Sequence, residues 1–232
     1  MCPAVSVVVA VGVAASLVSL YATVPQVLRA ARTRSAEGIS WDSLLLSLAT
    51  FTLWVVYAVA VADRIQLVNN TLALCLLGAL AVVVVRAGVA RNYWSAVLVV
   101  FASALASIWL LDVSNSFTLA MVGTTVSSLR MVPQTRLALS RAPLGGLCPW
   151  STLLGWLGMG LWLAYAVMVA DWALALCSLI GLTMQSAILA HRLPPRRTLE
   201  ALAGGRLGRP VAQLAAPVSA RFPAQRNYEL AA

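Results

Sequence analysis

The sequence predicts an all-α membrane protein with seven transmembrane helices, arranged as two three-helix repeats on either side of a linker helix. Three observations predict this fold: the apolar composition, seven apolar stretches of bilayer-spanning length, and an internal repeat with an offset of 108 residues. Of the 232 residues, 61% are hydrophobic and 10% are charged, and the mean hydropathy is +0.90. A soluble domain carries about 25% charged residues, so this chain lacks the polar surface that water requires.

The charged residues give a formal net charge of +9, from 16 basic and 7 acidic side chains, and every basic one is arginine. The absence of lysine excludes Schiff-base chemistry on a lysine side chain. In so apolar a chain the excess of arginine indicates membrane topology rather than nucleic-acid binding. The four cysteines form no CxxC pair and have no histidine nearby, so we expect no disulfide framework, metal site or cofactor.

The seven apolar stretches approach the roughly 20 residues that a helix needs to cross a bilayer core of about 30 Å. They cover about residues 4–30, 43–62, 65–86, 93–111, 115–139, 150–170 and 172–190. The fifth stretch is the least apolar, because serine and threonine residues and Arg130 interrupt it. The first has no basic n-region and no small-residue cleavage site, so we expect no cleaved signal peptide.

The arginines gather in alternate loops, which predicts the orientation of the chain. They follow the first, third, fifth and seventh stretches, whereas the opposite loops hold only Arg64, with aspartates. Because cytoplasmic loops carry the excess of arginine, we expect the N-terminus outside and the C-terminus in the cytoplasm. Residues 193–232 are rich in Pro, Gly, Ala and Arg and are predicted to form a disordered, basic cytoplasmic tail.

Rare residues recur in the two halves of the chain at the offset of 108 residues. The matched pairs are Ser19/Ser127, Val24/Val132, Pro25/Pro133, Gln26/Gln134, Gly38/Gly146, Ser43/Ser151, Trp54/Trp162, Tyr57/Tyr165 and Asp63/Asp171. Each copy contains three spans, and an unmatched span lies between them. This extra helix returns the chain to its starting side, so the two copies are predicted to be parallel. The expected units are a first repeat over 1–90, a linker helix over 91–112, a second repeat over 113–192 and the tail over 193–232.

The residues that recur also resemble a known family. The motif V-P-Q, a basic loop with R-S-A-E-G-I-S, and the run L-W-V-V-Y…A-D…N-N are similar to the PQ-loop superfamily, and within it to the SWEET and SemiSWEET sugar facilitators. The resemblance covers about residues 5–190. It implies a multi-pass protein of the cell membrane that moves a small sugar, a mono- or disaccharide, by alternating access as a uniporter.

Helix geometry places a candidate pocket near the middle of the membrane. Trp54 precedes Asp63 by nine residues, roughly 13 Å at the helical rise, and Asn70 follows it by seven, roughly 10 Å. Two indole faces and two short polar groups suit a neutral polyol. The resemblance implies that the Trp and Asn positions contact the substrate in both repeats. The candidate substrate-binding residues are Trp54, Asn70, Trp162, Ser178 and Thr50. Helix packing is the alternative role for midspan Trp and Asn.

Residues at both ends of the spans are gate candidates. The duplicated prolines kink their helices, and the glutamines beside them can pair the freed backbone groups. The resemblance implies that these residues form the hinge of an inner gate, and that a Tyr and an Asp of each repeat form an outer gate. The inner set is Pro25, Gln26, Pro133 and Gln134, and the outer set is Tyr57, Asp63, Tyr165 and Asp171. Static kinks, and a role for each Tyr as an interface anchor and each Asp as a loop residue, are the alternatives.

Arg130 is the charged residue that fits this scheme least well. It lies three positions before Pro133, where the first repeat has Ala22. An intramembrane arginine is a candidate contact for an anionic substrate, although it also has the reach to snorkel or to pair with Asp42. No carboxylate lies in the middle of a span, which favours passive diffusion over proton coupling.

Two further functions stay open. One is a PQ-loop carrier of an amino acid or organic anion that uses Arg130, and the other is a non-transporting PQ-loop receptor or assembly protein that docks through its tail. The sequence contains no nucleophile–base set, so we expect no enzyme. The expected partners are the lipid bilayer and a small molecule, with no nucleic acid. A monomer holds both repeats, and a homo-oligomer stays open.

Overall fold

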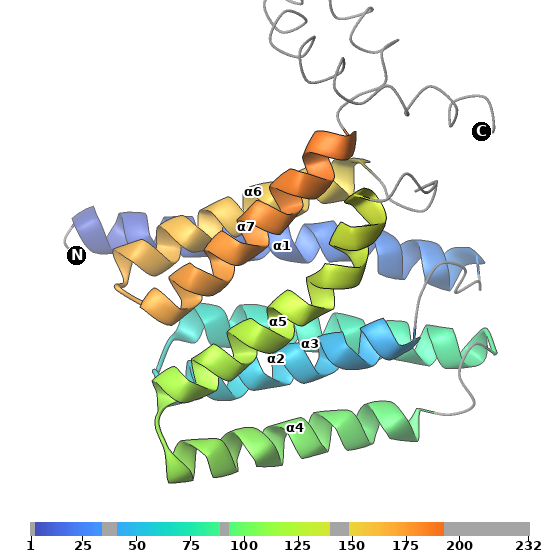
Figure 1. Cartoon of the computed structure of the whole chain (residues 1–232), viewed down its shortest axis with the longest axis horizontal. Coiled ribbons are helices and arrows are strands. Elements are labelled where there is room, and N and C mark those ends of the chain that lie inside the picture. The colour runs from blue at the N-terminus through green and yellow to red at the C-terminus, as the bar shows by residue number, and fades with distance from the viewer. Residues whose placement is uncertain (1–2, 34–40, 89–92, 140–148, 193–232) are drawn as a thin grey trace, which may run out of the picture.

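Seven helices make up the described part of the chain in the computed structural model (Figure 1). The structure describes residues 3–33, 41–88, 93–139 and 149–192. The helices are α1 (Pro3–Thr33), α2 (Trp41–Ala60), α3 (Arg64–Arg86), α4 (Trp94–Val113), α5 (Ser116–Leu139), α6 (Pro149–Met168) and α7 (Trp172–Arg192). Each predicted span falls on one of them. The predicted tail lies outside the described residues.

Five helices contain segments long and apolar enough to cross a membrane. These segments are Val7–Val24, Trp41–Ala60, Arg64–Arg86, Trp94–Val113 and Trp172–Leu189. A sixth apolar segment, Leu153–Met168 in α6, is shorter, and α5 does not qualify among the described residues. The chain is therefore a multi-pass membrane protein, and the expectation of an all-helical membrane fold is confirmed. Length and hydropathy support five of the seven predicted spans.

The polar residues explain why α5 falls below the hydropathy of its neighbours. Thr125, Ser128 and Thr135 each donate a hydrogen bond to the backbone carbonyl four residues earlier, at 2.8–2.9 Å. Such bonds satisfy the hydroxyl groups within the helix itself. Because these three hydroxyls are paired within the helix, they can lie in an apolar surrounding at little cost.

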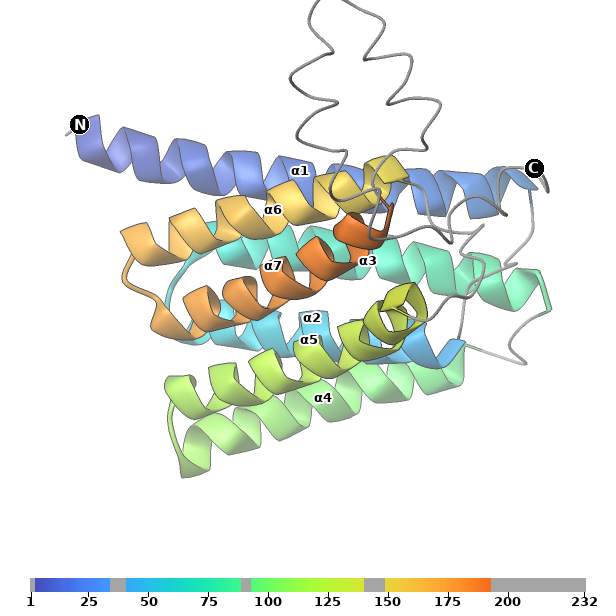
Figure 2. The ribbon, with the colours of Figure 1, turned by 45° about the horizontal axis from the view of Figure 1, so that its top comes forward.

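The main helix contacts repeat in the two halves of the chain. We call α1–α3 the first triplet and α5–α7 the second triplet. In the first triplet α3 packs against both α1 and α2, and in the second α7 packs against both α5 and α6. Between the triplets α1 packs against α6 and α2 against α5, so six helices form a closed ring. Helix α4 lies outside the ring against α2 and α5 (Figures 1 and 2).

The N-terminus and the short loops after α2, α4 and α6 lie at one end of the bundle, on the left of Figure 1. We call it the N-terminal end. Two of its loops have the same backbone: Ala62 and Ala170 have φ of 55° and 56°. The N–H groups of Asp63 and Asp171 each bond to the carbonyl five residues earlier at 2.9 Å. A left-handed residue followed by this bond is a Schellman-type helix end. Both helices therefore stop in the same geometry.

Each of these aspartates also begins the next helix. Asp63 Oδ1 accepts hydrogen bonds from the backbone N–H groups of Ile65 and Gln66, at 2.9 and 3.0 Å. Asp171 Oδ1 accepts one from the N–H of Leu174 at 3.0 Å. An aspartate at this position satisfies donors that a helix N-terminus leaves free. The sequence places the two caps at equivalent positions of α3 and α7, so the loops hold both carboxylates at the same end.

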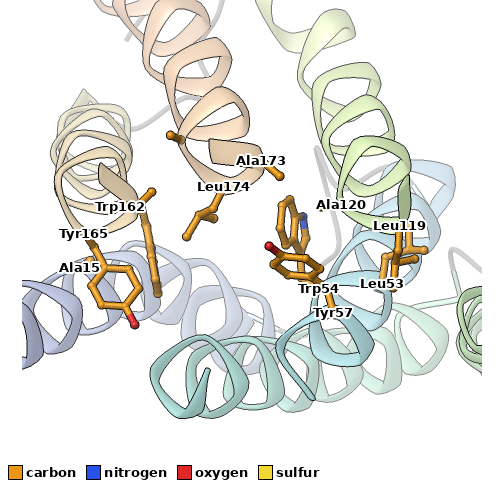
Figure 3. Close-up of a cluster of buried hydrophobic side chains, with 12 residues drawn as sticks. Ala15, Leu53, Trp54, Tyr57, Leu119, Ala120, Trp162, Tyr165, Ala173 and Leu174 are labelled. Atoms are coloured by element: carbon orange, nitrogen blue, oxygen red, sulfur yellow. The ribbon is translucent and has the colours of Figure 1, made fainter. Parts of the chain in front are cut away.

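The ring encloses the larger cluster of buried apolar side chains (Figure 3). This cluster includes Trp54, Tyr57, Trp162 and Tyr165, and α1, α5 and α7 also contribute to it. A second cluster joins α2, α3 and α4. On α4, by contrast, Trp109 is 64% exposed, as expected of a side chain that faces lipid. The two tryptophans predicted to line a pocket are therefore part of the interior.

Candidate functional site

The paired tryptophans lie inside the ring in matching environments. Trp54 and Trp162 are only 6% and 7% exposed, so neither indole faces lipid. Each ring meets the tyrosine one turn later edge to face. The ring centroids are 5.4 Å apart for Trp54 and Tyr57 and 5.6 Å for Trp162 and Tyr165, with interplanar angles of 88° and 87°. Figure 3 shows the two Trp–Tyr pairs on separate helices, α2 and α6. This edge-to-face geometry is favourable for aromatic pairs and holds each ring in position.

Each indole hydrogen-bonds to a serine of the other triplet. Trp54 Nε1 donates to Ser127 Oγ at 3.0 Å, and Trp162 Nε1 donates to Ser19 Oγ at 3.0 Å. The serines lie on α5 and α1, so the two bonds cross the boundary between the triplets in equivalent ways. Both serines belong to the matched pairs of the repeat, but sequence reasoning did not place them at the site. Their signal was the shared offset, since Ser and Trp recur together.

A glycine permits one of these bonds. A Cβ atom at Gly158 would lie 2.9 Å from Ser19 Oγ, the atom that accepts the bond from Trp162. Real Cβ atoms do not approach another atom this closely, so a side chain at position 158 would displace the serine. The small residue therefore lets α6 approach α1 closely enough for the indole of one triplet to reach the other.

The predicted polar residues of the site are also buried. Thr50, Asn70 and Ser178 are all buried, and Thr50 Oγ1 donates to the backbone carbonyl of its own helix at 2.7 Å. Asn69, which sequence reasoning did not select, is buried beside Asn70 and donates to Asn70 Oδ1 at 3.3 Å. Its own Oδ1 has no hydrogen-bond partner among the described residues. A buried acceptor without a partner is costly, and it can accept a hydrogen bond from a solute.

The outer-gate candidates meet at the N-terminal end of the bundle. Tyr165 Oη donates to both oxygens of Asp63, at 3.0 and 2.9 Å, and Tyr57 interacts in the same crossed sense with Asp171. Gln66 Nε2 donates to Asp63 Oδ2 at 2.8 Å and to Asp171 Oδ2 at 3.2 Å. Five side chains from both triplets thus form one hydrogen-bonded network, which joins the triplets at this end.

The burial of the two tyrosines in this network excludes the alternative role of interface anchor. Tyr57 and Tyr165 are 5% and 4% exposed, so they are not anchors at the lipid interface. Gln66 is an addition that the sequence did not indicate, because its counterpart at the repeat offset is Leu174. The inner-gate candidates Pro25, Gln26, Pro133 and Gln134 lie in α1 and α5, and their side chains fall outside the described residues.

Arg130 lies in the interior rather than at a helix end. Its guanidinium carbon is 5.6 Å from the centroid of the Phe51 ring, a cation–π distance. Its Nε is buried and has no hydrogen-bond partner among the described residues. Asp42, the alternative partner expected from the sequence, is exposed, and no described contact joins it to Arg130.

Comparisons with known proteins give a family-model match and a structural match. Residues 7–67 match the family model of the PQ loop repeat. Over this segment the chain is similar to the PQ loop repeat. The matched segment contains α2 and most of α1, with the first tryptophan and aspartate of the site. The resemblance expected from the sequence is therefore confirmed.

The likeness to a solved structure extends beyond the segment that the family model matches. The fold is similar to that of a eukaryotic SWEET transporter determined at 3.7 Å resolution, with a TM-score of 0.65 and 16% sequence identity. The similarity covers 79% of this chain and 94% of that transporter. No curated protein matches the chain. The likeness to that transporter shows a shared fold.

Removing the serine partners of the two indoles should destabilise the protein. In Ser19→Ala and in Ser127→Ala, a buried indole N–H loses its acceptor, which costs about 1–3 kcal/mol for each substitution. We expect lower thermal unfolding temperatures for the purified protein in detergent. Ser128→Ala is the matched control, because the partner of Ser128 among the described residues is a carbonyl of its own helix. Equal unfolding temperatures for all three variants would contradict a stabilising role for the crossed Trp–Ser bonds.

Proposed function

We propose that this protein is a PQ-loop carrier that moves small sugars passively, by alternating access between its two triplets. The observation that carries the proposal is the pair of buried indoles, each bonded across the triplet boundary inside a closed ring of six helices. Two parallel repeats, 1–90 and 113–192, joined by the linker helix would give the halves equal roles. The repeated helix contacts and the repeated loop geometry support that arrangement.

The chemistry of the interior suits a sugar. The indole N–H groups of Trp54 and Trp162 are engaged by serines, so the rings offer their apolar faces to the C–H face of a sugar. The free Oδ1 of Asn69 is an acceptor for a sugar hydroxyl. Thr50, Asn70 and Ser178 add buried polar groups, and sites for small molecules need few of these.

The crossed Tyr–Asp network supports a gate at the N-terminal end. Its bonds run between triplets, so a rocking motion of one triplet against the other would break them together. We place this end outside the cell membrane and the basic tail in the cytoplasm, as the arginine distribution predicts. The Pro-Gln pairs of α1 and α5 would form the hinge of the opposite gate. One chain supplies both triplets, so a single copy suffices for transport.

The carrier is proposed to be uncoupled. In the described spans, Asp63 and Asp171 cap helices at the N-terminal end, and no described carboxylate lies midway along a span. Proton-coupled carriers rely on intramembrane Asp, Glu or His relays. Passive exchange along the gradient therefore fits the charge distribution best.

The test is uptake of a panel of radiolabelled sugars into proteoliposomes, with and without a pH gradient. We expect at least one mono- or disaccharide to equilibrate across the membrane at a rate that the gradient does not change. Empty liposomes are the control. Accumulation above equilibrium under a pH gradient would overturn passive transport, and failure of every sugar and sugar derivative to enter would overturn the carrier itself.

A further inference from the structure

The function proposed above assigns no role to the interior side chain of Arg130. Arg130 lies on the same face of α5 as Gly123 and Ser127, which precede it by seven and three residues. A Cβ atom at Gly123 would contact the indole of Trp54 at 3.5 Å, and Ser127 hydrogen-bonds to the same indole. Phe51, the ring beneath the guanidinium, precedes Trp54 by three residues on α2. The guanidinium therefore lies about one helical turn from the Trp54–Ser127 bond, along the seam between the triplets.

Arg130 lies in the interior, among residues of three helices. Helix α5 carries it, Phe51 of α2 packs against it, and Cys177 of α7 is the one described titratable group that interacts with it. Although its Nε is buried, the residue as a whole is only partly buried. The neighbouring Leu129 is 57% exposed, so the lipid-facing side of α5 is a different face. Arg130 thus presents a cation to the interior of the ring.

The charge of Arg130 is not balanced by the described residues. No described carboxylate interacts with it, and its contact with Phe51 is a cation–π contact with an uncharged ring. An unpaired cation inside a membrane protein is costly, and one phenyl ring offsets only part of that cost. Asn69, on α3, is a buried acceptor without a partner. A solute with an anionic group and hydroxyl groups would satisfy both side chains.

We propose that Arg130 binds the carboxylate of the transported solute, so that this protein carries sugar acids in preference to neutral sugars. The proposal rests on the carrier function proposed above and narrows its substrate class. A carboxylate suits the site because its single charge matches the single guanidinium, and its two oxygens match the planar arrangement of the donors. The sugar ring would stack on the indoles while the acid group faces Arg130.

The first test compares glucose with glucuronate, which share a ring and differ in the carboxylate at C6. Proteoliposomes contain the wild type, Arg130→Gln, Arg130→Lys or Arg136→Gln. We expect wild-type kcat/KM to be about tenfold or more higher for glucuronate, because charge-assisted hydrogen bonds discriminate by that order. Arg130→Gln should abolish this ratio, Arg130→Lys should retain part of it, and Arg136→Gln, altered at an exposed residue of the same helix, should keep it.

The outcomes separate the two proposals. Wild-type transport of glucose with a ratio that Arg130→Gln does not change would overturn the sugar-acid proposal and leave the sugar carrier standing. If neither compound nor any other member of the sugar panel is transported, the carrier function fails instead. The position of Arg130 can be tested without knowledge of the solute, because a native cysteine lies close to it.

The second test uses Cys177 as a reporter in a chain with Cys2, Cys75 and Cys148 replaced by serine. A sulfonate-bearing and a trimethylammonium-bearing methanethiosulfonate are compared, each normalised to its rate with free cysteine. We expect the anionic reagent to modify Cys177 about tenfold or more faster, since local charge changes encounter rates by this order or more. Arg130→Gln should remove the preference and Arg136→Gln should not. If the two reagents modify Cys177 at equal rates in the presence of Arg130, or if neither reacts, the proposal that Arg130 lies on the solute path is overturned.

Discussion

The double variant Trp54→Ala, Trp162→Ala is expected to lose solute flux almost completely while its helices remain folded. In the proposed carrier each indole offers an apolar face to the solute, and loss of this contact would cost about 2 kcal/mol of transition-state binding. Two such losses lower the rate by roughly three orders of magnitude, at 1.4 kcal/mol for each factor of ten. Flux into proteoliposomes measures the effect, and size-exclusion chromatography with circular dichroism follows the fold.

Two controls distinguish a solute contact from packing. Trp109→Ala removes an indole that faces lipid, so flux should stay near that of the wild type. Trp54→Phe with Trp162→Phe keeps an aromatic face but deletes both crossed bonds to serine, and it should retain a measurable part of the flux. If the double alanine variant transports as well as the wild type, the two indoles do not form the substrate site.

The variant Asp63→Asn is expected to open the N-terminal end of the bundle. Asparagine caps a helix as well as aspartate does, so the start of α3 should survive. The hydrogen bonds from Tyr165 and Gln66, however, lose their charged acceptor. Each bond to a charged group contributes about 1.5–3 kcal/mol, so the closed population should fall by about tenfold or more. Asp171→Asn should act in the same direction, because its carboxylate shares Gln66.

Spin labels on the two loops measure this change directly. Val61 and Val169 are exposed and lie next to the two left-handed alanines, so cysteines at these positions can carry labels. In a background in which the four native cysteines are replaced by serine, Asp63→Asn should shift the distance distribution to longer values. Asp112→Asn, an exposed aspartate at the same end, is the control. An unchanged distribution would show that the Tyr–Asp network does not hold the gate closed.

The pattern of residues in the sequence was sufficient to predict the secondary structure and part of the candidate site. Apolar stretches predicted the helices because a bilayer imposes a minimum apolar length on a helix, whatever it packs against. The offset of 108 residues paired Trp54 with Trp162 and Asp63 with Asp171, and the structure gives both pairs matching environments. The weak hydropathy of the fifth span was also visible, because it depends only on composition.

The residues that break the repeat were the hardest to interpret. Gln66 bridges two carboxylates, yet its counterpart is Leu174, and Asn69 corresponds to Cys177. A repeat argument discards such positions because it looks for matches. Arg130, opposite Ala22, stood out by its charge, but its contact with Phe51 depends on how α5 packs against α2.

The sequence alone determined that this is a helical membrane protein, where its helices fall, and which residues the two halves share. These properties follow from hydropathy and spacing, which are local to each helix. Only the tertiary structure decided that each tryptophan bonds to the serine of the opposite triplet, and that each tyrosine meets the opposite aspartate. Those partners lie between 73 and 143 residues apart in the chain. They meet because α1 packs on α6 and α2 packs on α5. Side-chain packing between helices sets the order of the helices around the ring, and the residue pattern within a single helix does not contain that order.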